Sequence, residues 1–142
     1  MDTQEAARRW IAAWSAAWPA ADPEPLAAVY DDSAVFHSHP FRPRQSWRAY
    51  AEWAFADQAA AECRFGDPLA QGDRAAVDWW GVITAKDGSV ETVAGTSLLR
   101  FGADGRVVEQ RDAWAGEAGR HELPDWAAVP GSRGQAPEVP DP

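Results

Sequence analysis

The stretch Leu98–Trp114, LLRFGADGRVVEQRDAW, holds two runs of strand-forming residues on either side of an Asp-Gly pair. A second turn of the same chemistry, Lys86–Ser89, separates RAAVDWWGVITA from SVETVAGTSLLRF. Asp-Gly between β-branched and aromatic runs is typical of hairpins that join antiparallel strands. Together with the run AECRFGDPLAQGD, these segments predict that the chain after Ala60 forms a β-meander.

The first sixty residues instead repeat apolar side chains at the spacing of a helix. Three helices are predicted, over residues 3–18, 24–30 and 44–57. Trp10 and Trp14 share the apolar stripe of the first helix, and the segment SAVFHSHPF, which Pro40 ends, predicts a short edge strand. The predicted fold class is therefore α+β, with three N-terminal helices packed on a curved mixed or antiparallel sheet.

Length, charge and composition narrow the classes of protein. The 142 residues fit one domain, over residues 1–116, followed by a Gly- and Pro-rich tail over 117–142 that we expect to be partly disordered. A formal net charge of -9 argues against nucleic-acid and membrane-surface partners. No apolar segment is long enough to enter a membrane, so we expect a cytoplasmic protein. The single Cys63 excludes an internal disulfide, and zinc-type C-x-x-C spacing is absent.

Tryptophan is the compositional outlier. Nine tryptophans in one small domain require an unusually aromatic core, an apolar cavity, or both. Trp79 and Trp80 are neighbours in a predicted strand, so their side chains point to opposite faces of the sheet. Helices can cover one face, and a second subunit is a natural cover for the other, which predicts a homodimer.

Two passages resemble a known family. Three helices followed by a bent meander, with VYDDSAVFHSHPF before it and F-x-x-D-G-x-V-x-x-x-R-D-x-W at its end, resemble the SnoaL-like branch of the NTF2-like superfamily over about residues 3–115. The resemblance implies a cone-shaped fold whose concave sheet face and helices enclose an apolar pocket. Its members include polyketide cyclases, ketosteroid isomerases, epoxide hydrolases, dehydratases and binding modules, so the fold leaves the reaction open.

The ketosteroid isomerases supply one set of expectations. Their carboxylate base stands just before a proline in the passage that corresponds to HSHP, where this chain has His39. Their oxyanion hole uses a tyrosine and a protonated aspartate, at positions that correspond here to Trp10 and Ser97. The resemblance therefore implies a base at His39 within an incomplete isomerase set.

The epoxide hydrolases and cyclases supply a second set. Limonene-epoxide-hydrolase relatives hold a water with an Arg-x-Asp on the middle strand and an aspartate on the last strand. Asp78 and Asp112 match the two aspartates, whereas Ala76 replaces the arginine. SnoaL-type cyclases use an aspartate at the Asp112 position as general acid and base. The resemblances to the epoxide hydrolases and to the cyclases therefore both imply a role for Asp112.

A chemical hypothesis follows from these positions. We expect His39 to act as base, Asp112 as acid or orienting group, and Asp78 as their polar partner. Burial raises the pKa of a carboxyl group and a nearby imidazolium lowers it, so such a set can exchange protons near neutral pH. The residues expected to line the pocket are Trp10, Trp14, His37, Trp80 and Trp114.

Alternatives stand beside each of these roles. His37 has a simpler structural role, which is to hydrogen-bond a backbone carbonyl at the strand end, and Asp112 a simpler one in a salt bridge. A His-x-His pair also occurs in metal sites, although the family pattern implies no metal and no cofactor. We expect a cofactor-independent enzyme that cyclises, isomerises or hydrolyses a small hydrophobic molecule. The alternatives are non-catalytic binding of a hydrophobic ligand and a dimerisation domain with a vestigial pocket.

Overall fold

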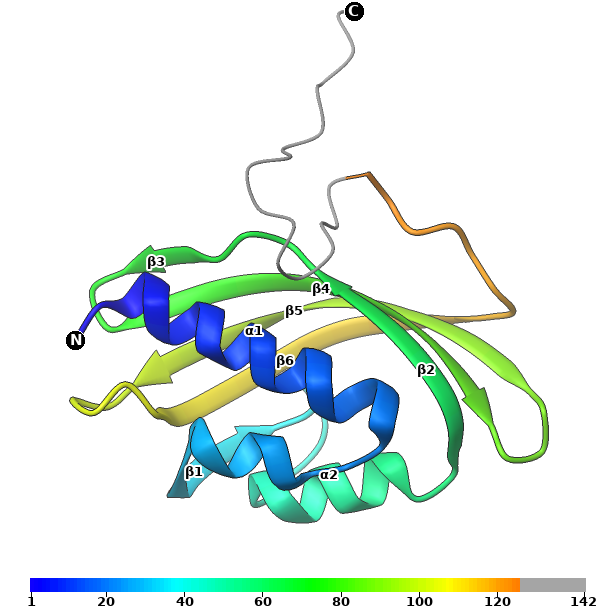
Figure 1. Cartoon of the computed structure of the whole chain (residues 1–142), viewed down its shortest axis with the longest axis horizontal. Helices are drawn as coiled ribbons and strands as arrows, with labels where there is room; N and C mark the ends of the chain where they lie inside the picture. Colours follow the sequence, from blue (N-terminus) through cyan, green and yellow to red (C-terminus); the bar gives the residue numbers. More distant parts are fainter. Residues whose placement is uncertain (126–142) are drawn as a thin grey trace, which may run out of the picture.

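A computed structural model describes residues 1–125 of the chain. In chain order its elements are α1 (Thr3–Ala20), the 3-10 helix η1 (Glu24–Ala28), β1 (Tyr30–His37), α2 (Trp47–Phe55), β2 (Gln58–Phe65), β3 (Leu69–Gln71), β4 (Arg74–Ala85), β5 (Val90–Phe101) and β6 (Val107–Ala118). The predicted α+β class is confirmed, with helices packed against a strongly curved sheet (Figure 1). No helix among residues 1–125 is long and apolar enough to span a membrane.

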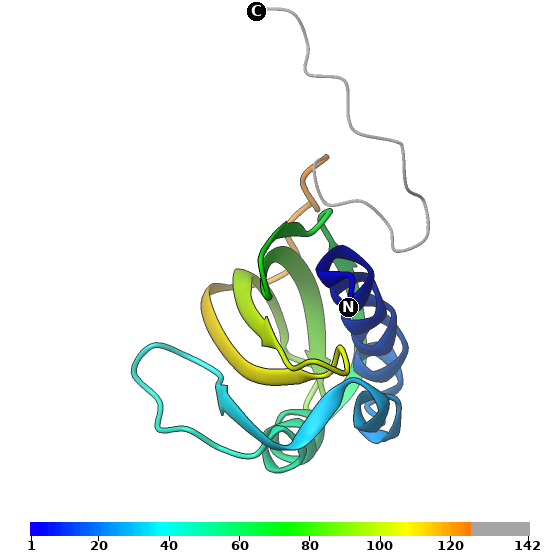
Figure 2. The same ribbon diagram turned by 90° about the vertical axis from the view of Figure 1, so that its left-hand side faces the viewer.

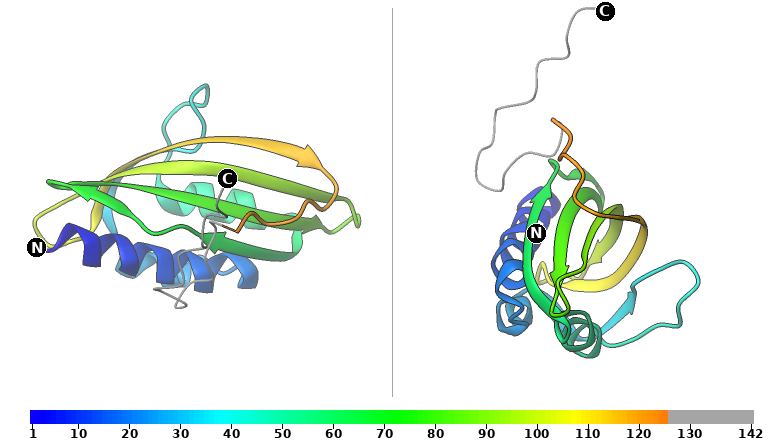
Figure 3. Two further views of the ribbon diagram at one scale, coloured as in Figure 1. Left: turned by 90° about the horizontal axis from the view of Figure 1, so that it is seen from above. Right: turned by 90° about the vertical axis from the view of Figure 1, so that its right-hand side faces the viewer.

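The sheet has the strand order β1-β6-β5-β4-β2, with β3 paired to β4. Strands β4, β5 and β6 form the predicted antiparallel meander, while β1 runs parallel to β6 and makes the sheet mixed. Figure 2 shows how far the long strands bend around the interior, and Figure 3 shows α1 and α2 on the inner side of that bend. This curvature creates the space in which the candidate site lies.

The helices differ in part from the prediction. The first extends through Pro19 to Ala20 and ends where Ala21 adopts a left-handed conformation. A proline in the last turn removes only its own N–H donor, so the helix continues through it. The second is a 3-10 helix that ends at Ala28, instead of a helix that reaches Tyr30, as is common for such short segments. Tyr30 begins β1 instead.

Strand β6 continues to Ala118, past the predicted domain boundary at residue 116. Residues 126–142 of the predicted tail, Trp126 included, lie outside the described residues.

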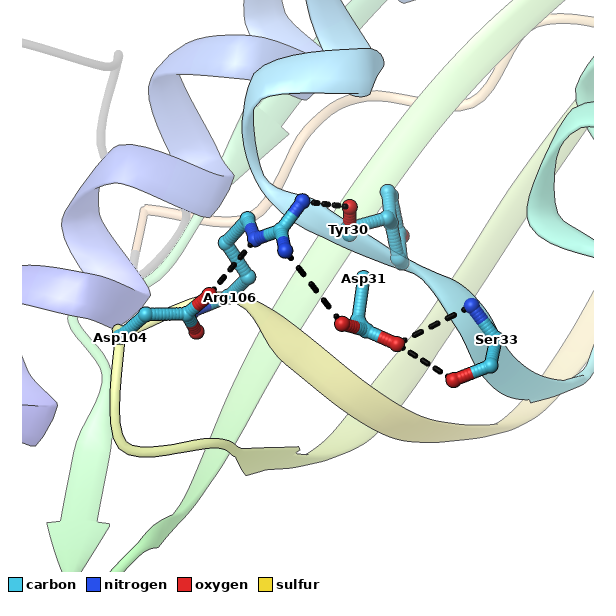
Figure 4. A network of polar contacts seen from close by, with 5 residues as sticks. All are labelled: Tyr30, Asp31, Ser33, Asp104 and Arg106. Carbon is cyan, nitrogen blue, oxygen red and sulfur yellow. Dashed lines mark hydrogen bonds and ion pairs between the residues drawn. The ribbon is translucent and has the colours of Figure 1, made fainter.

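Polar contacts attach β1 to the turn before β6 (Figure 4). Arg106 bonds Asp104 at 2.8 Å and Asp31 at 3.4 Å, and it donates to the backbone carbonyl of Tyr30 at 3.5 Å. Ser33 donates its backbone N–H at 3.0 Å and its hydroxyl at 2.5 Å to Asp31, and these bonds lower the pKa of that carboxyl. The junction fixes the start of β1, and with it the buried side chain of Tyr30.

Residues of β4 alternate between the two faces of the sheet. Val77, Trp79 and Gly81 are buried on the concave face, whereas Asp78 is exposed and Trp80 half-buried on the convex face. Trp79 and Trp80 therefore do point to opposite faces. The homodimer remains a prediction.

Glycine on the concave face makes room for the tryptophans. A Cβ atom at Gly95 would lie 2.5 Å from the backbone oxygen of Ala113 and 2.9 Å from the ring of Trp79. Real Cβ atoms do not approach so closely, and a backbone atom in the middle of a ladder has little freedom to move away.

We predict that Gly95→Ala destabilises the fold by about 1–3 kcal/mol through overpacking. Urea denaturation followed by tryptophan fluorescence measures this loss. Glu117→Ala, an exposed change on the neighbouring strand, is the control and should stay within about 0.5 kcal/mol of the wild type. Equal unfolding midpoints for Gly95→Ala and the wild type would contradict the packing described.

Candidate functional site

A cavity of about 620 Å³ opens between the concave face of the sheet and the helices α1 and α2. Its volume is in the range of pockets that hold small molecules. Six of the nine tryptophans line it, and these are Trp10, Trp14, Trp18, Trp53, Trp79 and Trp114. Flat apolar walls of this kind exclude water and suit a flat, hydrophobic guest.

Asp112 brings a carboxyl group into this apolar cavity. The residue is only 8% exposed and lies on β6 opposite Ser97 of β5. Ser97 donates its hydroxyl to Oδ1 at 2.6 Å, and Gln110 donates its amide Nε2 to the same oxygen at 2.9 Å. Among the described residues, no side chain hydrogen-bonds Oδ2. Because Oδ1 already accepts two bonds, a proton carried by this carboxyl resides on Oδ2.

Burial sets the protonation of Asp112. Removal of the carboxylate from water raises the pKa of Asp112 to about 6, although the hydrogen bonds from Ser97 and Gln110 oppose the shift. A carboxyl group with this pKa has both its charged and its neutral form available near neutral pH. Such a group can accept a proton and return it within one reaction cycle.

A second layer of hydrogen bonds fixes the orientation of Gln110. Its Oε1 accepts from the indole N–H of Trp10 at 3.1 Å and from the hydroxyl of Tyr30. Tyr30 in turn accepts from Trp10 and from Trp14, each at 2.9 Å. With donors on the oxygen side, the amide NH₂ faces Asp112. Donors from α1 and β1 therefore fix the Gln110 amide, and this amide in turn holds the Asp112 carboxyl group.

Trp79 adds a parallel restraint from β4. Its indole N–H donates to the Ser97 hydroxyl at 2.9 Å, so that hydroxyl is free to donate its own hydrogen to Asp112. The hydroxyls of Ser97 and Tyr30 thus each accept a hydrogen bond from a tryptophan. Ser97 donates to Asp112, and Tyr30 donates to Gln110.

Tyr50 on α2 lines the same cavity. Burial, and then the nearby charge of Asp112, raise the pKa of the Tyr50 hydroxyl well above its ordinary value, so the hydroxyl keeps its hydrogen. It makes no hydrogen bond with any other described side chain or backbone group. Tyr50 is therefore a donor without an acceptor, close enough to Asp112 for the two groups to interact electrostatically.

Four of the predicted site residues line the cavity, namely Asp112, Trp10, Trp14 and Trp114. His39 does not. It follows the end of β1, its ring packs edge-on against Trp114 at 5.4 Å, and its Nδ1 accepts the backbone N–H of Phe41 at 3.3 Å. His39 thus supports a wall residue, and the structure does not bring it together with Asp112 in the cavity.

Asp78, Trp80 and His37 lie on the opposite side of the sheet from the cavity. Asp78 is exposed there and accepts a hydrogen bond from Thr96 at 2.7 Å. Its strand pairing explains this, because Val77, not Asp78, is opposite Ser97. His37 pairs with the exposed Arg111, while the preceding residue pairs with Gln110 and is buried.

Metal-ligand clusters and reactive thiols are both absent among residues 1–125. Within residues 1–125, no group of three or more His, Cys, Asp or Glu side chains is arranged to hold a metal ion. Burial, and then the charge of Glu62, raise the pKa of the Cys63 thiol to about 12, so this cysteine is not an activated nucleophile.

Sequence reasoning missed Tyr50 and Arg42 as site residues. Tyr50 belongs to the apolar stripe of the third predicted helix, and a hydroxyl within such a stripe was the available signal. Arg42 lies in the loop after Pro40, where no periodicity indicates the direction of a side chain. Both line the cavity.

Comparisons with known proteins agree with this architecture. Residues 7–110 match the sequence profile of the SnoaL-like domain. The epoxide hydrolase/cyclase-like enzyme SalBIII has a similar structure, with a TM-score of 0.67, 14% identity, and coverage of 83% of this chain and 100% of that one. AclR from Streptomyces galilaeus matches with a TM-score of 0.66, 19% identity, and coverage of 80% of each chain.

An NTF2-like protein from Exiguobacterium sp. 255-15 has a TM-score of 0.63 and 19% identity, over 78% of this chain and 98% of its own. At these identities the likeness establishes the fold alone. No curated protein sequence matches the chain significantly.

The raised pKa of Asp112 predicts a specific pH dependence of stability. In the folded protein Asp112 keeps its proton up to about pH 6, whereas an unfolded aspartate loses it near 3.8. The folded state therefore loses stability as pH rises between these values, by about 3 kcal/mol in total. Asp112→Asn does not ionise, so its free energy of unfolding relative to wild type should increase by that amount from about pH 3 to about pH 7.

Urea denaturation of both proteins across this range measures the difference. Parallel stability profiles for Asp112→Asn and wild type would show that the carboxyl group has an ordinary pKa in the folded protein.

Proposed function

Because the chain belongs to the SnoaL-like domain family, we propose that it is a cofactor-independent enzyme that transfers protons on a small hydrophobic molecule. One observation carries this proposal. Asp112 lines an aromatic cavity of about 620 Å³, with Oδ1 held by two donors and Oδ2 without a hydrogen-bond partner among residues 1–125. An oxygen that faces the cavity without a protein donor is accessible to a substrate, and a proton-transfer group requires such access.

The proposed cycle uses the two forms of Asp112 in turn. As a carboxylate, its Oδ2 accepts a proton from a C–H or O–H group of the substrate. As a carboxylic acid, it returns that proton at another atom, and the carboxylate is regenerated. Positioned acid and base groups of this kind accelerate reactions by about 10²- to 10⁴-fold. The tryptophan walls keep water away from the reacting atoms, which strengthens the electrostatic interactions within the cavity.

Tyr50 has a complementary role in this proposal. Removal of a proton next to a carbonyl group places negative charge on the substrate oxygen. A neutral hydroxyl without an internal acceptor is a suitable donor to that oxygen. The Tyr50 hydroxyl meets both conditions, since burial keeps it protonated and it makes no hydrogen bond with the described residues. His39 has no role in the proposed chemistry because it does not line the cavity.

Cyclisation and isomerisation fit the site better than hydrolysis. Both need one group that removes a proton and returns it elsewhere, and both benefit from a dry cavity. Hydrolysis needs a held water molecule, and the arginine of the epoxide-hydrolase motif is replaced by Ala76. SalBIII, which shares the fold, acts in pyran ring formation, and this supports cyclisation as the reaction class.

Hydrogen exchange tests the proposal without knowledge of the natural substrate. A panel of bicyclic ketones, with 2-tetralone as the first member, is incubated with the protein in D₂O, and incorporation of deuterium is followed by NMR. We predict exchange next to the carbonyl above the buffer rate, and a loss of about 10²-fold or more of that excess in Asp112→Asn.

Asp78→Asn is the matched control. Both residues are strand aspartates that accept a hydrogen bond from a β5 hydroxyl, but Asp78 lies on the convex face. The rate of ketone hydrogen exchange with Asp78→Asn should equal that with the wild-type protein. Ketone binding without any enzyme-dependent exchange would instead favour a protein that binds a hydrophobic ligand and does no chemistry.

A further inference from the structure

Arg42 stands where the cavity meets solvent. It lies in the loop between β1 and α2, which projects away from the sheet beside α2 (Figure 3). Its side chain lines the cavity together with Trp53, which is 61% exposed. A residue that is so exposed and still lines the cavity marks its mouth. By the same measure the exposed Asp57 and Glu91 also lie at the mouth, so Arg42 is the one cation among the described lining residues there, while Asp112 lies buried within.

Two tryptophans from different elements hold the guanidinium group. Its Cζ atom lies 5.1 Å from the ring centroid of Trp53 on α2 and 5.4 Å from that of Trp114 on β6. Trp114 is itself anchored, because its indole N–H donates to the backbone carbonyl of Ser38 at 2.7 Å. Contact with aromatic faces orients a guanidinium plane and leaves the N–H groups on its edges available.

Most of these donors have no partner among the residues that the structure describes. Arg42 donates from Nη1 to the hydroxyl of Ser38 at 3.2 Å. A guanidinium group has five N–H donors, so one neutral acceptor leaves most of its capacity unused. No carboxylate within residues 1–125 forms an ion pair with Arg42, although Asp57 and Glu91 also line the cavity. A half-buried cation without a counter-ion is suited to an anionic ligand.

We propose that Arg42 binds a carboxylate group of the ligand, so that the site takes planar aromatic acids. Their apolar body lies among the tryptophans and their carboxylate at the mouth. The inference rests on the proposed function in that it concerns the same cavity. The geometry also gives the ligand a direction, with its acidic end at Arg42 and its apolar end toward Asp112. The exposed Asp57 and Glu91 also line the cavity, and their charges disfavour an anion except beside Arg42.

Binding of two matched probes to the wild-type protein tests this proposal directly. The probes are 2-naphthoate and 2-naphthamide, which differ in charge but little in shape, and quenching of the lining tryptophans reports binding at neutral pH. A charge-assisted hydrogen bond exceeds a neutral one by enough to predict about tenfold tighter binding of the acid. Equal affinities, or no binding of either probe, would overturn the proposal.

Variants then assign the preference to one residue. Arg42→Gln should bind both probes equally, whereas Arg44→Gln, a change at an exposed arginine of the same loop outside the cavity lining, should retain the preference for the acid. Circular dichroism establishes that each variant folds, and the wild-type comparison stands without any variant. Retention of the full preference in a folded Arg42→Gln protein would contradict the assignment.

Asp112→Asn separates this proposal from the proposed function. It should lose ketone exchange but still prefer naphthoate. Exchange that survives in Asp112→Asn alongside an intact acid preference would reject the catalytic role of Asp112 and leave the role of Arg42 in place.

Discussion

The two hydrogen bonds to Oδ1 of Asp112 are the contacts on which the site depends. A carboxyl group that enters an aromatic cavity loses its hydration, and this loss costs several kcal/mol unless other donors replace the water. Ser97 and Gln110 supply those donors on one oxygen only. The compensation is therefore partial. It is enough to retain the group in the interior, but not enough to keep its pKa at the ordinary value of an aspartate.

The tryptophans serve both the core and the site. Trp10, Trp14 and Trp79 pack in the buried apolar core, while their indole N–H groups donate to Tyr30, Gln110 and Ser97. Such donors do not titrate near neutral pH, so the network around Asp112 stays the same when the carboxyl gains or loses its proton. A rigid, non-titrating surround suits a single group that exchanges protons, because little of the protein must rearrange.

The sequence predicted the elements of this fold better than the site. Strong alternation and Asp-Gly turns located the meander, and helical spacing located the stripe of Trp10 and Trp14. Alternation also placed Asp78 and Trp80 together on one face. It gave no information on which face bends inward, since curvature depends on packing between strands. The concave glycines, Gly81 and Gly95, were the local signal, because only small residues leave room for the opposing tryptophans.

The family resemblance identified positions better than roles. Trp10 and Ser97, matched to the oxyanion hole of the isomerases, do lie beside Gln110 and Asp112. His39, matched to the isomerase base, lies outside the cavity because the chain turns after β1 and its ring packs on Trp114. The conformation of the loop that holds His39 and Pro40 depends on tertiary contacts. The spacing of two histidines does not predict it.

Titration of the Asp112 side-chain carboxyl by ¹³C NMR, with and without a ligand in the cavity, tests the proton-transfer role most directly. We expect a midpoint near 6 in the free protein and a change of midpoint when an apolar ligand displaces water from Oδ2. A midpoint near the ordinary value of 3.8, unaffected by ligand, would mean that this carboxyl is an ordinary structural group.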